Sequence, residues 1–206
     1  MILVALDAIA DAPRAVNARV AHHLHVTPAP ALLDLHDPGS EYPERDREDA
    51  ARLFALEADA PGPGGAPATA APHAHAPDTL VRLARRNLIA GVTTTRAPAC
   101  RATANAWLAG VGLGTLPLEG ITDAHGRADV RALMLLVRHR RVGLLIEHDP
   151  RIAHEIANAG TPVILFDLPY NTALTHPLVL RAYGWRGIHD ALMALPLDAR
   201  RDRRGF

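Results

Sequence analysis

Short apolar runs alternate along this chain with longer segments whose apolar positions recur at helical spacing. Four of these runs, ILVAL, LIAGVT, VGLLI and PVILF, cover residues 2–6, 88–93, 142–146 and 162–166. Each has the length of one strand and carries no charge, which is typical of a strand buried on both faces of a sheet. The segment LPLEGI, residues 116–121, predicts one more short strand.

The segments between these runs predict helices. Apolar positions at helical spacing occur in residues 12–24, 100–111, 128–139, 151–160 and 184–195. Within them, Pro13 suits the first turn of a helix and Gly160 suits a helix end. Strands that alternate with helices in this way predict an α/β fold, in which a parallel sheet carries helices on both of its faces.

Two stretches interrupt the alternation. Residues 27–60 are rich in charge, and ERDREDAARLFAL within them predicts a helix, so we expect a small helical cap inserted after the first helix. Residues 61–77 contain only Pro, Gly, Ala, Thr and His, a composition typical of a loop or linker. The predicted organisation is a core domain, a cap, a linker and a charged tail, which comprise residues 1–26 with 78–197, 27–60, 61–77 and 198–206.

Composition excludes several classes of enzyme. The 22 basic residues are all arginine, so the chain has no lysine for a P-loop or a Schiff base. Its single serine, Ser40, lies in the turn-like segment PGSEY and not in the Gly-x-Ser-x-Gly motif of a serine hydrolase. The single cysteine, Cys100, rules out an internal disulfide framework.

Charge and hydropathy also bear on partners and location. The 22 acidic residues balance the basic ones, so no net charge attracts nucleic acid or a membrane surface. No apolar run reaches the roughly 20 residues of a membrane-spanning helix. The opening apolar stretch lacks the basic region and the length of a signal peptide. We therefore expect a cytoplasmic protein with no nucleic-acid or membrane partner.

Acidic and hydroxyl side chains follow several of the predicted strands. They are Asp7 after the first strand, Thr93, Thr94, Thr95 and Arg96 after the second, and Glu147, His148 and Asp149 after the run VGLLI. Because the carboxyl ends of parallel strands meet at one edge of a sheet, these side chains are expected to share a site there. Carboxylate oxygens suit Mg²⁺, and threonine hydroxyls suit a phosphate group. The alternative is that the same residues cap helices and solvate the strand ends.

The order of the segments ILVALDAIAD, VTTTRAP, LLIEHDP and VILFDLPYN resembles the haloacid dehalogenase (HAD) superfamily of phosphatases. Within that superfamily the resemblance is to the 5′(3′)-deoxyribonucleotidase-like branch, and it implies a HAD-like, Rossmann-type sheet with a cap inserted after the first motif. It also implies Mg²⁺-dependent hydrolysis of a nucleotide or another phosphomonoester. The residues that it implies are the catalytic acids Asp7 and Asp11, the phosphate-binding residues Thr94, Thr95, Arg96 and Arg131, and the Mg²⁺ ligands Asp7, Glu147 and Asp149.

The first motif of that family, Asp-x-Asp, is incomplete in this chain. If Asp7 is aligned with the second acid, Ala5 takes the place of the nucleophile. If Asp7 is aligned with the nucleophile, Ile9 stands where the acid belongs. Either alignment leaves one carboxylate missing.

The third and fourth motifs are altered as well. The family's phosphate-neutralising lysine has no counterpart, and Arg131 and Arg127 are the candidates to replace it, with a different reach and geometry. His148 takes the position of the main metal ligand, and because imidazole is a poor ligand for Mg²⁺ the metal is expected to bind weakly. Tyr170 and Asn171, in the segment FDLPYN, predict a structural turn.

These changes favour a homologue of the 5′-nucleotidases with eroded motifs and weak or no phosphohydrolase activity, which binds a phosphate-bearing ligand or a protein partner. One alternative is an active Mg²⁺-dependent phosphomonoesterase with a rearranged site, in which Asp7 is the nucleophile and Asp11 or Asp149 assists. Another is an interaction domain with an empty cleft. All three require a fold that brings Asp7 to the same edge as Thr94 and Glu147.

Overall fold

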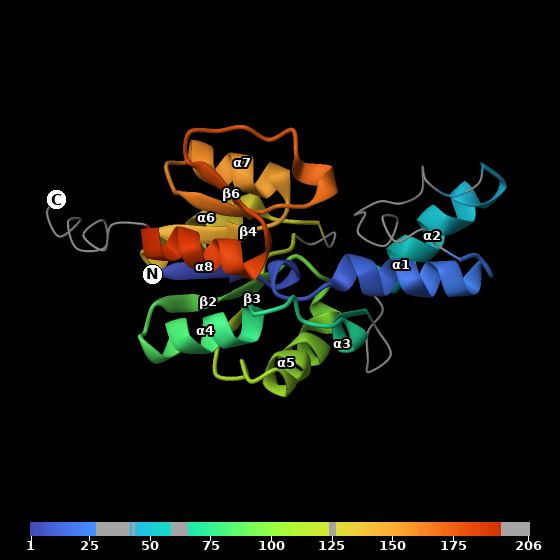
Figure 1. Cartoon of the computed structure of the whole chain (residues 1–206), viewed down its shortest axis with the longest axis horizontal. Coiled ribbons are helices and arrows are strands. Elements are labelled where there is room, and N and C mark those ends of the chain that lie inside the picture. The colour runs from blue at the N-terminus through green and yellow to red at the C-terminus, as the bar shows by residue number, and fades with distance from the viewer. Residues whose placement is uncertain (28–41, 43, 59–65, 124–126, 195–206) are drawn as a thin grey trace, which may run out of the picture.

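A computed structural model describes residues 1–27, 42, 44–58, 66–123 and 127–194, and its centre is a parallel sheet of six strands (Figure 1). The strands are β1 (Ile2–Ala5), β2 (Ile89–Thr94), β3 (Leu118–Gly120), β4 (Leu144–Glu147), β5 (Val163–Phe166) and β6 (Val179–Ala182), in the order β3-β2-β1-β4-β5-β6. The chain first builds outward from β1 through β2 and β3, then crosses to the other side of β1. This reversal between β1 and β4 is where open α/β sheets bind ligands. The predicted α/β fold is confirmed.

Helices cover both faces of the sheet (Figure 1). On one face lie α4 (Ala76–Arg85), α5 (Arg101–Gly110) and α8 (Gly184–Ala194), and their buried side chains pack against Val4, Val92 and Ile164. On the other face lie α6 (Val130–His139) and α7 (Pro150–Asn158), which pack against Leu3, Leu145 and Leu165. Strands β1, β2, β4 and β5 are buried along their whole length, which explains their uninterrupted apolar sequences.

A pair of helices lies beside the sheet, next to the carboxyl end of β1 (Figure 1). Helix α1 (Ala12–His23) packs on α2 (Arg47–Ala58) through a small core of Val16, Val20, Tyr42 and Ala50. Glu57 of α2 accepts a hydrogen bond from Arg19 at 2.5 Å and lies 3.0 Å from Nε2 of His23. The helix predicted within the cap therefore forms, and its partner is α1, which the sequence assigned to the core range 1–26.

Three parts of the structure were not predicted. Helix α4 begins at Ala76, inside the segment 61–77 expected to be a loop or linker, and a short helix α3 (Ala66–Thr69) lies in the same segment. The indole N–H of Trp107 donates to the carbonyl of Ala70 at 2.8 Å, so this segment packs onto α5. Strand β6 was missed because it is a short, half-exposed edge strand without a continuous apolar run. The tail 198–206 lies outside the described residues, and the predicted domain boundaries stay predictions.

Trp185 of α8 fixes the turn that follows β1. Its side chain is 1% exposed, and its indole N–H donates to the carbonyl of Ala8 at 2.7 Å. Ala8 belongs to the short 3₁₀ helix η1 (Leu6–Ala8), which carries Asp7. The last helix of the described chain thereby holds the turn that presents Asp7. None of the described helices has both the length and the apolar character needed to span a membrane.

Replacing Trp185 by Phe should lower the free energy of unfolding by about 1–3 kcal/mol, because the buried carbonyl of Ala8 loses its donor. Urea denaturation followed by circular dichroism measures this change. The matched control is Tyr183→Phe, because Tyr183 is 85% exposed and its change should stay within about 0.5 kcal/mol. Equal effects of the two substitutions would contradict the anchoring role of Trp185.

Candidate functional site

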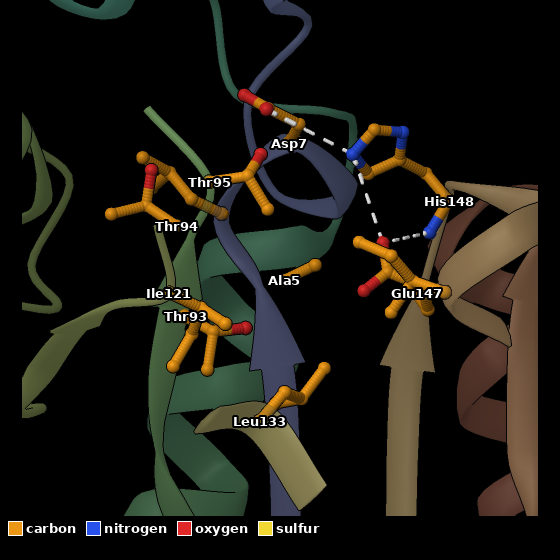
Figure 2. Close-up of a pocket in the computed structure, with 11 residues that line it drawn as sticks. Ala5, Asp7, Thr93, Thr94, Thr95, Ile121, Leu133, Glu147 and His148 are labelled. Atoms are coloured by element: carbon orange, nitrogen blue, oxygen red, sulfur yellow. Dashed lines mark hydrogen bonds and ion pairs between the residues drawn. The ribbon is translucent and has the colours of Figure 1, made fainter. Parts of the chain in front are cut away.

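A narrow cleft opens at the carboxyl ends of β1, β2 and β4, at the reversal point of the sheet (Figure 2). Its open space is about 290 Å³ with the solvent at its mouth included. The lining residues are Ala5, Leu6, Asp7, Thr93, Thr94, Thr95, Ile121, Leu133, Glu147, His148 and Ile152. Asp7, Thr94 and Glu147 thus share one cleft, as the sequence required, while their chemical roles stay predictions.

Ala5 is the last residue of β1, and its methyl group lines the cleft (Figure 2). It is paired in register with Thr93 of β2 and lies between Thr93 and Glu147 in the view of Figure 2. Ile9, in contrast, is fully buried in the core and is not one of the lining residues. The strand end that faces the cleft centre therefore carries an apolar side chain.

Asp7 is held by a cation. Its Oδ1 accepts a hydrogen bond from Nη2 of Arg96 at 2.7 Å, and its Oδ2 lies 3.8 Å from Nε2 of His148. The side chains of Asp7 and Arg96 are only 13% and 9% exposed, so water screens this ion pair weakly. Arg96, which the family resemblance assigned to phosphate, is here the partner of Asp7.

Glu147, at the end of β4, is buried beside these charges. Its side chain is 3% exposed, and Oε1 accepts the backbone N–H groups of His148 at 2.8 Å and Asp149 at 3.1 Å. Burial raises the pKa of Glu147 to about 8 despite these two hydrogen bonds, and the nearby carboxylates of Asp149 and Asp7 add to the rise. Glu147 is therefore mostly uncharged at neutral pH.

His148 is oriented by Tyr170, which the sequence analysis did not place in the site. The hydroxyl of Tyr170 lies 2.8 Å from Nδ1 of His148, and the two rings meet edge to face at 88°. Burial raises the pKa of Tyr170, and the nearby acids raise it further, so the phenol keeps its proton. When the phenol donates a hydrogen bond to Nδ1, that nitrogen carries no proton. The imidazole proton then lies on Nε2, which faces Asp7 and Glu147 (Figure 2).

Asn171 has the structural role predicted for its turn. Its buried amide donates to the carbonyls of His148 at 3.0 Å and Phe166 at 2.8 Å. It thereby ties the end of β5 to the segment after β4. Tyr170 is next to it in the chain and reaches His148 for that reason. The segment FDLPYN signalled a turn, but its contact with β4 depends on the pairing of β4 with β5.

Four predicted site residues lie outside the lining of the cleft, namely Arg96, Asp11, Arg131 and Asp149. Asp149 caps α7, because its Oδ1 accepts the N–H of Arg151 at 2.8 Å and its Oδ2 lies 3.2 Å from the guanidinium of Arg151. Burial would raise the pKa of Asp149, but the hydrogen bonds and charge of Arg151 lower it. Asp11 precedes α1 and lies 3.4 Å from Arg14, and Arg131 is exposed on α6. Asp149 therefore caps a helix, as the alternative interpretation of the strand-end residues predicted.

Arg127, the other candidate for the missing lysine, is exposed and pairs with Asp123 at 3.7 Å. It is not a lining residue either. Within the ranges that the structure describes, no three His, Cys, Asp or Glu side chains are grouped so that they could hold a metal ion. Of the three side chains expected to hold Mg²⁺, Asp7 and Glu147 line the cleft and Asp149 does not.

Comparison with known proteins gives the fold but no close relative. No family model matches the chain, and no curated protein does. Among solved structures, the chain is similar to a haloacid dehalogenase-like hydrolase family protein from Streptococcus pneumoniae, with 10% identity, a TM-score of 0.60, and 94% of this chain and 96% of that chain covered. It is also similar to a putative phosphatase from Clostridium difficile, with 11% identity, a TM-score of 0.60, and 93% and 97% covered.

A third similar structure is that of Protein Tyrosine Kinase A from Mycobacterium tuberculosis, with 14% identity, a TM-score of 0.62, and 93% and 97% of the two chains covered. These matches extend over nearly the whole length of each protein. The chain therefore has the fold of the haloacid dehalogenase-like hydrolases. At such low identity, the likeness shows the fold alone, and the nucleotidase-like branch stays a prediction.

The raised pKa of Glu147 predicts a pH dependence of stability. Folded Glu147 keeps its proton up to about pH 8, whereas an unfolded glutamate loses it near its ordinary pKa of 4.5. The folded state binds more protons between these values, so Glu147 makes stability fall as the pH rises through this window. Glu147→Gln removes that contribution, and the stability of the variant relative to the parent should rise between about pH 5 and about pH 8 and stay level above it. Urea denaturation at each pH measures it, and a constant difference would contradict a buried, protonated Glu147.

Proposed function

We propose that the chain is a phosphatase-like protein with eroded motifs, which binds a phosphate-bearing ligand and hydrolyses it weakly or not at all. The observation that carries this proposal is the methyl group of Ala5 at the end of β1, in the middle of the cleft. Phosphatases of the family that the sequence resembles place their attacking carboxylate in the first motif, after the first strand. A methyl group cannot form a phosphoryl-enzyme bond.

Without the nucleophile, the acid that assists it has no reaction to assist. In this alignment Asp7 corresponds to the acid that protonates the leaving oxygen, a step that contributes roughly 10²–10⁴-fold to rate. Asp7 is paired with Arg96, so its carboxylate is stabilised in the charged form, which cannot donate a proton. Because such groups act as a unit, the loss of one leaves little function for the others.

The alternative of an active enzyme makes Asp7 the nucleophile. The ion pair with Arg96 disfavours it, because a charge-assisted hydrogen bond at 2.7 Å withdraws electron density from the carboxylate and fixes its orientation. The assisting acids named for this alternative, Asp11 and Asp149, do not line the cleft. Among the acidic residues that the structure describes, Glu147 alone lines the cleft together with Asp7.

The cleft keeps features that suit an oxyanion. Thr94 and Thr95 bring hydroxyl groups to it, and Nε2 of His148 lies at the same edge. With Glu147 neutral, the negative charge of Asp7 is balanced by Arg96, and an incoming anion meets little net repulsion.

A nucleoside monophosphate is the first ligand to test, because the sequence resembles the 5′(3′)-deoxyribonucleotidase-like branch. A structural neighbour described as a putative phosphatase supports the wider class of phosphomonoesters. Stacking or polar contacts to the base would come from the cap side, where α1 and α2 lie beside the carboxyl end of β1 (Figure 1).

We expect no release of phosphate from nucleoside monophosphates above the uncatalysed rate, with or without Mg²⁺. The physical reason is the methyl group of Ala5 in place of a nucleophile. A malachite-green assay on the full chain measures it, and Asp7→Asn is the matched variant. Turnover that disappears in Asp7→Asn would establish the active alternative with Asp7 as nucleophile.

Replacing Thr95 by Val should weaken binding of a nucleoside monophosphate by about tenfold, because one hydrogen bond to the phosphate is lost. The side chains of threonine and valine have nearly the same shape, so the substitution should leave the fold unaffected. Isothermal titration calorimetry measures the change. Thr172→Val is the control, because the exposed hydroxyl of Thr172 donates to the carbonyl of Pro169 outside the cleft. Equal affinities of the two variants would place the phosphate elsewhere.

A further inference from the structure

His148 lies where two acidic side chains of the cleft converge. Its Nε2 is 3.8 Å from Oδ2 of Asp7 and 3.7 Å from Oε1 of Glu147, and its side chain is only 8% exposed (Figure 2). In the family that the sequence resembles, the carboxylates at these strand ends are held together by Mg²⁺. Here a nitrogen donor stands between them.

The side chains present do not fit Mg²⁺. This ion requires near-octahedral coordination by oxygen atoms, and imidazole suits other metals. Both carboxylates that face the cleft are already engaged, Asp7 by Arg96 and Glu147 by two backbone N–H groups. The third expected ligand, Asp149, caps α7 and pairs with Arg151. One oxygen of each of these three carboxyl groups therefore already accepts a hydrogen bond.

We propose that the cleft binds its oxyanion without a metal ion, and that the Nε2–H of His148 takes the place of the cation. The inference rests on the proposed function, because it concerns how the same cleft holds a phosphate group. Nε2–H of His148 donates to the anion, the Thr94 and Thr95 hydroxyls contact its other oxygens, and Arg96 holds Asp7 away from it.

Tyr170 is the positioning residue of this arrangement. Its hydroxyl lies 2.8 Å from Nδ1 of His148, and a phenol that donates there selects the tautomer with the imidazole proton on Nε2. Asn171 fixes the same turn by donating to the carbonyl of His148. Both residues come from the segment after β5, so the donor in the cleft is oriented by a neighbouring strand and not by its own.

The experiment is a calorimetric titration of the full chain with inorganic phosphate. It is carried out once in the presence of EDTA and once with Mg²⁺. We expect the same dissociation constant in both conditions. His148→Ala should weaken phosphate binding by about tenfold, while His154→Ala, which changes an exposed histidine of α7, should not. His148→Asp restores a carboxylate at this position, and its phosphate binding should become dependent on Mg²⁺.

A second measurement does not depend on the folding of any His148 variant. The ¹⁵N shifts of the His148 ring should show the Nε2–H tautomer in the parent chain and a mixture of tautomers in Tyr170→Phe. An Nδ1–H tautomer in the parent would overturn the role of Tyr170 and with it the donor at Nε2.

The outcomes separate the two proposals. Phosphate binding that requires Mg²⁺ in the parent chain overturns the metal-free inference and leaves the proposed function standing. Phosphate binding that resists EDTA and weakens in His148→Ala supports both. If phosphate and nucleoside monophosphates bind under neither condition, the proposed function fails and the metal-free inference fails with it.

Discussion

Every acidic group at the carboxyl edge of the sheet must be stabilised after it has lost its water. The buried strands β1, β2 and β4 deliver Asp7, the threonines and Glu147 to one narrow cleft, and the low exposure of these side chains makes an uncompensated charge costly there. The chain meets this constraint in three ways. Asp7 is paired with Arg96, Glu147 stays protonated and accepts two backbone N–H groups, and a histidine lies between them.

This internal neutralisation links the substitutions in the motifs to each other. A site that relies on Mg²⁺ needs several charged carboxylates with free oxygens, and a site without the metal cannot tolerate them. In the alignment that matches Asp7 with the second acid, Ala5 and His148 each stand where the resemblance expects a carboxylate. The two replacements lower the negative charge of the cleft together, so they are consistent with one electrostatic design and do not require independent explanations.

The sequence predicted the fold well where the physical signal is local. Uninterrupted apolar runs marked β1, β2, β4 and β5, because strands covered on both faces need no polar positions. Edge strand β6 and helix α4 gave weaker signals, since β6 is half exposed and α4 begins in a segment rich in Pro, Ala and His. The meeting of Asp7, Thr94 and Glu147 followed from the rule that parallel strands share an edge. The pairing of Asp7 with Arg96, and of His148 with Tyr170, could not be predicted, because each depends on side-chain directions set by tertiary contacts.

The hydrogen bond from Trp185 to the carbonyl of Ala8 joins residues 177 positions apart in the chain. During synthesis on a ribosome, β1 emerges long before α8, so the turn that carries Asp7 lacks its anchor until α8 has been made. Contacts of such long sequence separation form late, because closing a long loop costs entropy before the contact stabilises it. The nascent chain therefore exposes an unfinished cleft until α8 has been made, and a truncation before α8 would leave the cleft without its supporting turn.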